Sequence, residues 1–145
     1  MNWIVALSNF PCLYPLWRAK GDWWTFATIS FVSIASFISH LAENHKHNMP
    51  GALDVSKQCS YFLNRLDEFG CVLTIARFSQ LYYYKYGLYH QGVVEHPFLV
   101  LSALFAFICL KISAFLDGKP YVVMHSVWHI AIMIIMGHYL QIIYN

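Results

Sequence analysis

Three short segments contain residue types that bind metal ions and move protons. The last apolar run of the chain carries His125 and His129, four residues apart, in "HSVWH". An earlier run carries Ser36 and His40 with the same spacing, in "SFISH", and Asp67 lies in the run between them. Residues four apart project from one face of a helix, so each pair can present its side chains to a common point.

These residue types predict a zinc site. Three neutral imidazoles and one water form a tetrahedral site of the open, catalytic kind, whose water is acidic enough to yield hydroxide near neutral pH. We expect His40, His125 and His129 to be the metal ligands. Asp67 would take the proton from the water, and Ser36 would position the water or donate to a developing oxyanion.

Each of these residues also has a simpler interpretation. Asp67 could be half of an ion pair with Arg65, and Ser36 could hydrogen-bond to the backbone of its own helix, as serines in apolar helices often do. His45 and His47, in the polar stretch "ENHKHNMPG", are interpreted as solvated side chains. The metal hypothesis depends on the conjunction of four groups on three segments, since an HxxxH pair alone is weak evidence.

The composition indicates a membrane protein. The chain has 145 residues, of which 59% are hydrophobic and 11% charged, whereas an ordinary soluble domain carries about 25% charged residues. The net charge of +2 is small, and no basic patch is visible, so nucleic acid is not an expected partner. The chain has no internal repeat or linker, which predicts a single transmembrane domain over residues 1–145.

About 20 mostly apolar residues are needed to cross a bilayer, and five segments approach this description. They are residues 2–17, 23–42, 59–84, 97–116 and 121–143. The fold class predicted from them is all-α, a multi-pass transmembrane helix bundle of about five spans. The first span is interrupted by Pro11 and Pro15. The third contains Arg65, Asp67 and Arg77, so it cannot face lipid on all sides, and it ends in a tyrosine-rich stretch typical of an interface or a short extra helix.

Five crossings place the chemical groups on one side of the membrane. His40 lies near the end of the second span, Asp67 about two turns into the third, and the histidine pair near the start of the fifth. Each position is close to the membrane face that bears the polar loop after residue 42 and the "DGKP" turn. A change of one crossing between Asp67 and His125 would separate them.

The order of these motifs resembles the CREST superfamily. That group includes alkaline ceramidases, adiponectin-type receptors, post-GPI-attachment proteins and myomaker-like membrane proteins. The resemblance covers residues 30–140 and rests on "SFISH", "LDEFG" and "HSVWH". The segments "LDEFG" and "HSVWHI" look closest to the ceramidase-like and myomaker-like branches.

The resemblance implies a zinc held inside the membrane by His40, His125 and His129, with Asp67 and Ser36 beside its water. It implies hydrolysis of an amide or ester bond of a membrane lipid, in the endomembranes of the ER or Golgi. Family members usually have seven spans, and this chain is about two helices short between Asp67 and His125. The alternative is therefore a non-catalytic accessory or structural subunit of a larger membrane complex, in an organellar membrane, with other membrane-protein subunits as partners.

Overall fold

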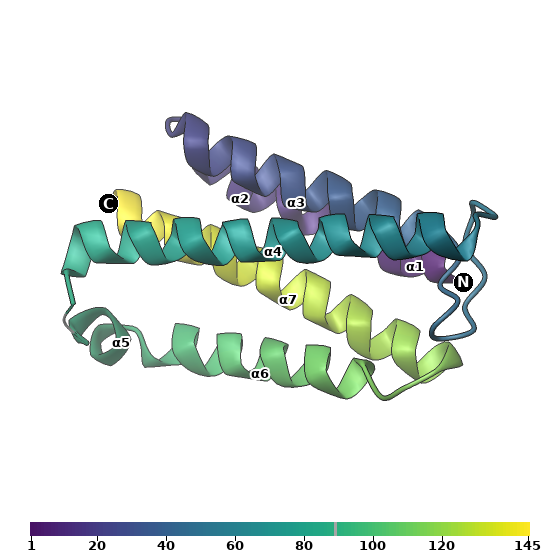
Figure 1. Cartoon of the computed structure of the whole chain (residues 1–145). Helices are drawn as coiled ribbons and strands as arrows, with labels where there is room; N and C mark the ends of the chain where they lie inside the picture. Colours follow the sequence, from purple (N-terminus) through teal and green to yellow (C-terminus); the bar gives the residue numbers. More distant parts are fainter. Residues whose placement is uncertain (89) are drawn as a thin grey trace.

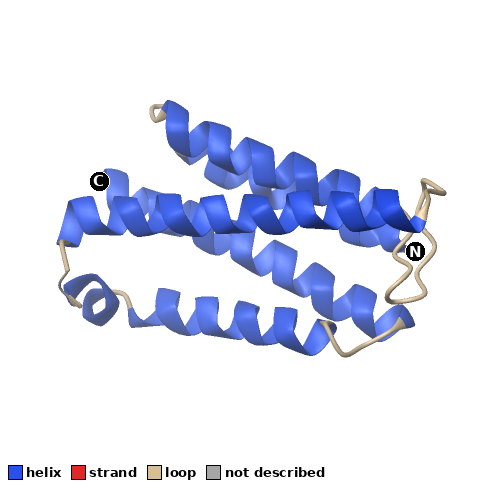
Figure 2. Cartoon of the chain, viewed as in Figure 1, coloured by secondary structure: helices blue, strands red, loops and turns tan. Residues whose placement is uncertain are grey.

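The computed structural model describes residues 1–88 and 90–145, and every regular element in these ranges is a helix (Figures 1 and 2). The elements are α1 (Asn2–Leu7), η1 (Phe10–Cys12), α2 (Leu13–Arg18), α3 (Trp23–Leu41), α4 (Lys57–Tyr86), α5 (Gln91–Glu95), α6 (Pro97–Ser113) and α7 (Gly118–Tyr144). The all-helical fold class is confirmed.

The long helices match the later apolar runs of the sequence. The runs 23–42, 59–84, 97–116 and 121–143 correspond to α3, α4, α6 and α7. Local capping fixes two of the helix starts. Asp22 accepts a hydrogen bond from the backbone N–H of Thr25 before α3, and Ser56 accepts one from Cys59 before α4, which satisfies donors that have no partner within the helix.

The first run, residues 2–17, is not one continuous helix. It is divided into α1, η1 and α2, with a turn at residues 8 and 9. Pro11 lies in the short 3₁₀ helix and Pro15 in the first turn of α2. Proline has no N–H to donate and is tolerated only near a helix start. These two positions therefore favour the start of a new helix over the continuation of the preceding one.

Successive segments of the bundle alternate in direction (Figure 1). The N-terminus, the loop of residues 42–56 and the turn of residues 114–117 lie at one end, which we call the loop end. The turn before α3, the segment around α5 and the C-terminus lie at the opposite end.

The tyrosine-rich stretch of residues 82–92 was predicted to be an interface or a short extra helix. It includes residue 89, which lies outside the described residues, and α5 begins near its end at Gln91.

α7 runs through the middle of the bundle and contacts α1, α2 and α6, whereas α3 packs against α4 and α1. The main core contains Ile29, Met133 and Leu140. Gly137 of α7 lets the Tyr14 ring approach the α7 backbone closely. A Cβ atom at Gly137 would lie 2.2 Å from Cδ1 of Tyr14, so the N-terminal segment sits against bare backbone of α7.

A polar network joins three helices at the end opposite the loop end. The Asp22 carboxylate accepts hydrogen bonds from the Thr25 hydroxyl (2.6 Å), from Arg77 (2.5 Å) and from the Tyr144 hydroxyl (2.8 Å). This network gives Arg77 of α4 its charged partner. It therefore ties the start of α3 to α4 and to the end of α7.

Among the described residues, α3 and α7 are long and apolar enough to cross a membrane, by length and composition. α6 is apolar but has 17 residues. The longer α4 carries charges along its length. The chain is thus a helical bundle with two candidate membrane spans, and the count of five spans stays a prediction.

Candidate metal centre

Three histidines from two helices converge inside the loop end of the bundle. His40 comes from the last turn of α3, and His125 and His129 come from the first half of α7. Their ring centroids are 4.8 to 5.0 Å apart in all three pairs. His40 and His129 are each 4% exposed, and His125 is half-buried. One ligand nitrogen from each ring lies within 4.8 Å of the other two.

The fold explains this convergence. The i, i+4 spacing puts His125 and His129 on one face of α7, and the alternating direction of the segments brings the end of α3 beside the start of α7 (Figure 1). The predicted clustering of the three histidines at one end of the bundle is confirmed.

Asp67 and Ser36 lie beside the histidines. Oδ2 of Asp67 is 3.8 Å from Nε2 of His40, and its side chain is 16% exposed. The Ser36 hydroxyl is 3.5 Å from Nε2 of His129 and also interacts with Asp67. Ser36 therefore faces the cluster, contrary to the interpretation that it bonds to its own helix.

The ion-pair interpretation of Asp67 is wrong. Arg65 instead binds Glu68 on the same helix, at 2.7 Å, and both of these side chains are half exposed. Asp67 points to the opposite, inner side of α4, where its partners are His40 and Ser36.

Two serines that the sequence did not single out contact the outer nitrogens of the histidines. Ser8, just after α1, lies 2.9 Å from Nδ1 of His129. Ser113, the last residue of α6, lies 2.9 Å from Nδ1 of His125. Isolated serines carry no spacing signal, so no pattern in the sequence could have identified them.

His47 corrects another expectation. It was interpreted as solvated, but it is 7% exposed. Its ring stacks on Tyr121, with centroids 4.2 Å apart, and its Nδ1 bonds to the carbonyl oxygen of Leu116 at 2.7 Å. Met49, from the same loop, packs with Tyr121 and Val5. The loop of residues 42–56 thus covers the loop end next to the histidines.

The side chains present fit a metal ion. Nε2 of His40 is buried and has no hydrogen-bond partner among the described residues, an arrangement that is costly without a ligand. Zinc–nitrogen distances of about 2.0–2.1 Å put tetrahedral ligands roughly 3.4 Å apart. Because the ligand nitrogens lie within 4.8 Å of one another, each ring would need to move by less than about 1 Å to reach a common ion. Imidazole nitrogens suit zinc, copper, iron and nickel, so the donor set alone does not name the metal.

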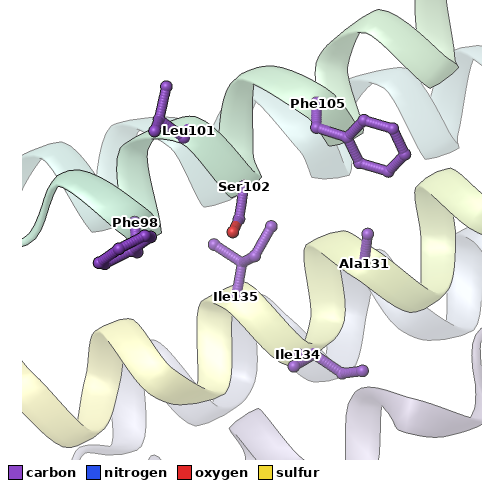
Figure 3. A pocket seen from close by; sticks show the side chains of 7 residues that line it. All are labelled: Phe98, Leu101, Ser102, Phe105, Ala131, Ile134 and Ile135. Atoms are coloured by element: carbon purple, nitrogen blue, oxygen red, sulfur yellow. The ribbon is translucent and has the colours of Figure 1, made fainter.

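A separate groove of about 430 Å³ lies between α6 and α7 (Figure 3). Its lining is apolar except for Ser102 and includes Phe98, Phe105, Ala131 and Ile135. Successive helical residues are 100° apart, so Ala131 lies on nearly the opposite face of α7 from His129. The groove therefore faces away from the histidine cluster.

One curated relative is similar over nearly its whole length. It is an uncharacterized protein of Acanthamoeba polyphaga mimivirus, 46% identical over 97% of this chain and 96% of the viral protein. No family model matches the chain. No solved structure matches it. At this identity and coverage, the chain belongs to the same family as the mimivirus protein.

Proposed function

We propose that this protein is a multi-pass membrane protein that binds zinc at His40, His125 and His129 and hydrolyses an amide or ester bond of a membrane lipid. The observation that carries the proposal is the convergence of three imidazoles, two of them buried, with a carboxylate and a hydroxyl beside them. The likeness to the CREST superfamily suggests the same chemistry.

The other side chains have separate roles in this reaction. When bound in such a site, zinc supplies Lewis acidity, which polarises an acyl carbonyl and makes water a nucleophile near neutral pH. Asp67, 3.8 Å from His40, accepts the proton of the attacking water. Ser36, beside both Asp67 and His129, orients that water or donates a hydrogen bond to the oxyanion.

Lipid is the proposed substrate class because large parts of the outer surface of the bundle are apolar. α6 exposes large hydrophobic side chains along its length, among them Phe98, Leu101, Leu104, Phe105 and Ile108. At the end opposite the loop end, Trp23, Trp24 and Tyr84 are each at least 70% exposed, as in the aromatic belts of membrane interfaces. These features support several membrane crossings, in which α4 and α6 span the bilayer together with α3 and α7.

The first experiment is a measurement of metal content by mass spectrometry on detergent-purified protein. We expect about one zinc per chain in the wild type, and its loss in His125→Ala. His138→Ala is the matched control, because His138 lies on the same helix but bonds to Tyr14. Wild-type protein without metal would overturn the proposal.

The second candidate is an accessory subunit in which the metal only joins helices. The burial of His40 and His129 favours it, together with the position of Asp67, which a modest movement would make a fourth ligand. Structural zinc sites are closed by four protein ligands, whereas catalytic ones keep an open position. Zinc that stays bound in Asp67→Asn would favour the hydrolase, and zinc that is lost would favour the subunit.

A further inference from the structure

The hydrogen bonds of His129 determine which of its nitrogens carries the proton. Nδ1 lies 3.3 Å from the carbonyl oxygen of Val5 and 2.9 Å from the Ser8 hydroxyl oxygen. The carbonyl can only accept, and Ser8 donates its own proton to the same Val5 oxygen at 2.6 Å. Nδ1 of His129 must therefore carry the hydrogen, which leaves the lone pair on Nε2.

His125 is held in the same way from another helix. The Ser113 hydroxyl donates to the carbonyl oxygen of Leu110 at 2.7 Å and lies 2.9 Å from Nδ1 of His125. With its one proton directed to Leu110, the Ser113 oxygen accepts a hydrogen bond from Nδ1–H of His125. Ser113 is 1% exposed, so water does not compete for this bond. The lone pair of His125 is again on Nε2.

We infer that Ser8 and Ser113 are positioning residues of the metal centre, each fixing the tautomer and ring orientation of one histidine ligand. This inference rests on the proposed metal site. Metal-bound histidines generally donate their second ring N–H to a fixed acceptor, and removal of that acceptor weakens metal binding. Here the acceptors are hydroxyl groups, each oriented by a backbone carbonyl in its own helical turn.

Through Ser8, the N-terminal segment takes part in the site. Ser8 lies in the interrupted segment before α3, outside the residues that carry the family resemblance. That segment is itself fixed at the loop end, because the backbone N–H of Asn2 donates to Pro50 and its side chain donates to Ala42. α7 is thus braced on one side by the N-terminal segment and on the other by α6.

The test compares zinc affinity in full-length, detergent-purified variants by competition with a chromophoric chelator. We expect Ser8→Ala and Ser113→Ala each to lower affinity by about 10- to 100-fold. Ser8→Thr keeps a hydroxyl and should restore binding. Ser33→Ala is the matched control, since Ser33 is buried on α3 and its hydroxyl has no partner in the described part of the chain. Its affinity should equal that of the wild type.

Nitrogen NMR of histidine-labelled, metal-free protein provides a second measurement. The wild type should hold His125 and His129 with the proton on Nδ1, and each alanine variant should lose this preference at its own histidine. If zinc binds equally well to the wild type and both alanine variants, the inference fails and the metal site stands. If the wild type binds no zinc, the proposed function fails. The NMR then decides the inference, because Nε2–H tautomers in the wild type would overturn it.

Discussion

Nε2 of His40 and Oδ2 of Asp67 lie 3.8 Å apart, on two different helices, and His40 has no hydrogen-bond partner for that nitrogen among the described residues. The separation is too long for a direct hydrogen bond. The Asp67 carboxylate and the His40 imidazole face one another at this distance, and either side chain could move slightly to bind a ligand. Asp67 is therefore placed to act on a ligand of the proposed metal site.

Asp67→Asn should abolish most hydrolysis while zinc stays bound. The amide has nearly the same shape but cannot accept a proton, so the rate of cleavage of a fluorescent lipid amide in micelles should fall by about 10²- to 10⁴-fold. Metal content, measured on the same samples, should remain near that of the wild type. Glu68→Gln is the control, because Glu68 is half exposed and pairs with Arg65. A variant that hydrolyses the lipid at the wild-type rate would exclude Asp67 as the base.

Asp22→Asn should destabilise the protein, with an effect that depends on pH. Burial would raise the pKa of the Asp22 carboxyl, but hydrogen bonds from Thr25, Tyr144 and Arg77 outweigh it and hold the pKa well below its usual range. A carboxylate with a lowered pKa stabilises the fold fully above the unfolded-state pKa of about 3.9 and loses this contribution as the pH falls further.

The expected loss for Asp22→Asn is about 1–3 kcal/mol near neutral pH, because the variant leaves Arg77 without its charged partner. Thermal unfolding in detergent should show a constant difference in Tm from the wild type between about pH 7 and pH 5, which shrinks below about pH 4. Asp54→Asn, in the exposed part of the loop, should melt like the wild type. A difference that grows on acidification would contradict the assignment.

Gly137→Ala should destabilise the bundle by about 1–3 kcal/mol, since the added methyl would overlap the Tyr14 ring. Gly21→Ala is the matched control, because a Cβ there meets no atom within 4 Å and the backbone is not in the left-handed region. Chemical denaturation in mild detergent measures both variants. Equal stability would mean that Tyr14 does not rest on α7.

His47→Ala should loosen the loop of residues 42–56 by removing the stack on Tyr121 and the bond to Leu116, a loss of about 1 kcal/mol for the hydrogen bond alone. Hydrogen exchange of the loop amides should become faster, and metal release to a chelator should become faster with it. Lys46→Ala, at an exposed position of the same loop, is the comparison. Unchanged exchange would show that the loop is held by other contacts, such as those of Met49.

Much of the helical content could be predicted from composition. The runs that became α3, α6 and α7 are apolar over whole helical lengths, and "DGKP" marks where α7 begins. Pro11 and Pro15 were recognised as interruptions, but the sequence did not reveal that they would divide the first run into three pieces. Proline removes donors locally, whereas the direction of the chain after it depends on packing against α7.

The clustering of His40, His125 and His129, with Asp67 and Ser36 beside them, could be predicted because it follows from helical periodicity and from the order of the segments along the chain. His125 and His129 share a face wherever α7 lies. The acceptors at Ser8 and Ser113, the burial of His47 and the pairing of Arg65 with Glu68 were decided only by the tertiary structure. Each of these contacts depends on which helices are neighbours and on how each helix is rotated about its own axis. Side-chain packing between segments far apart in the chain sets both.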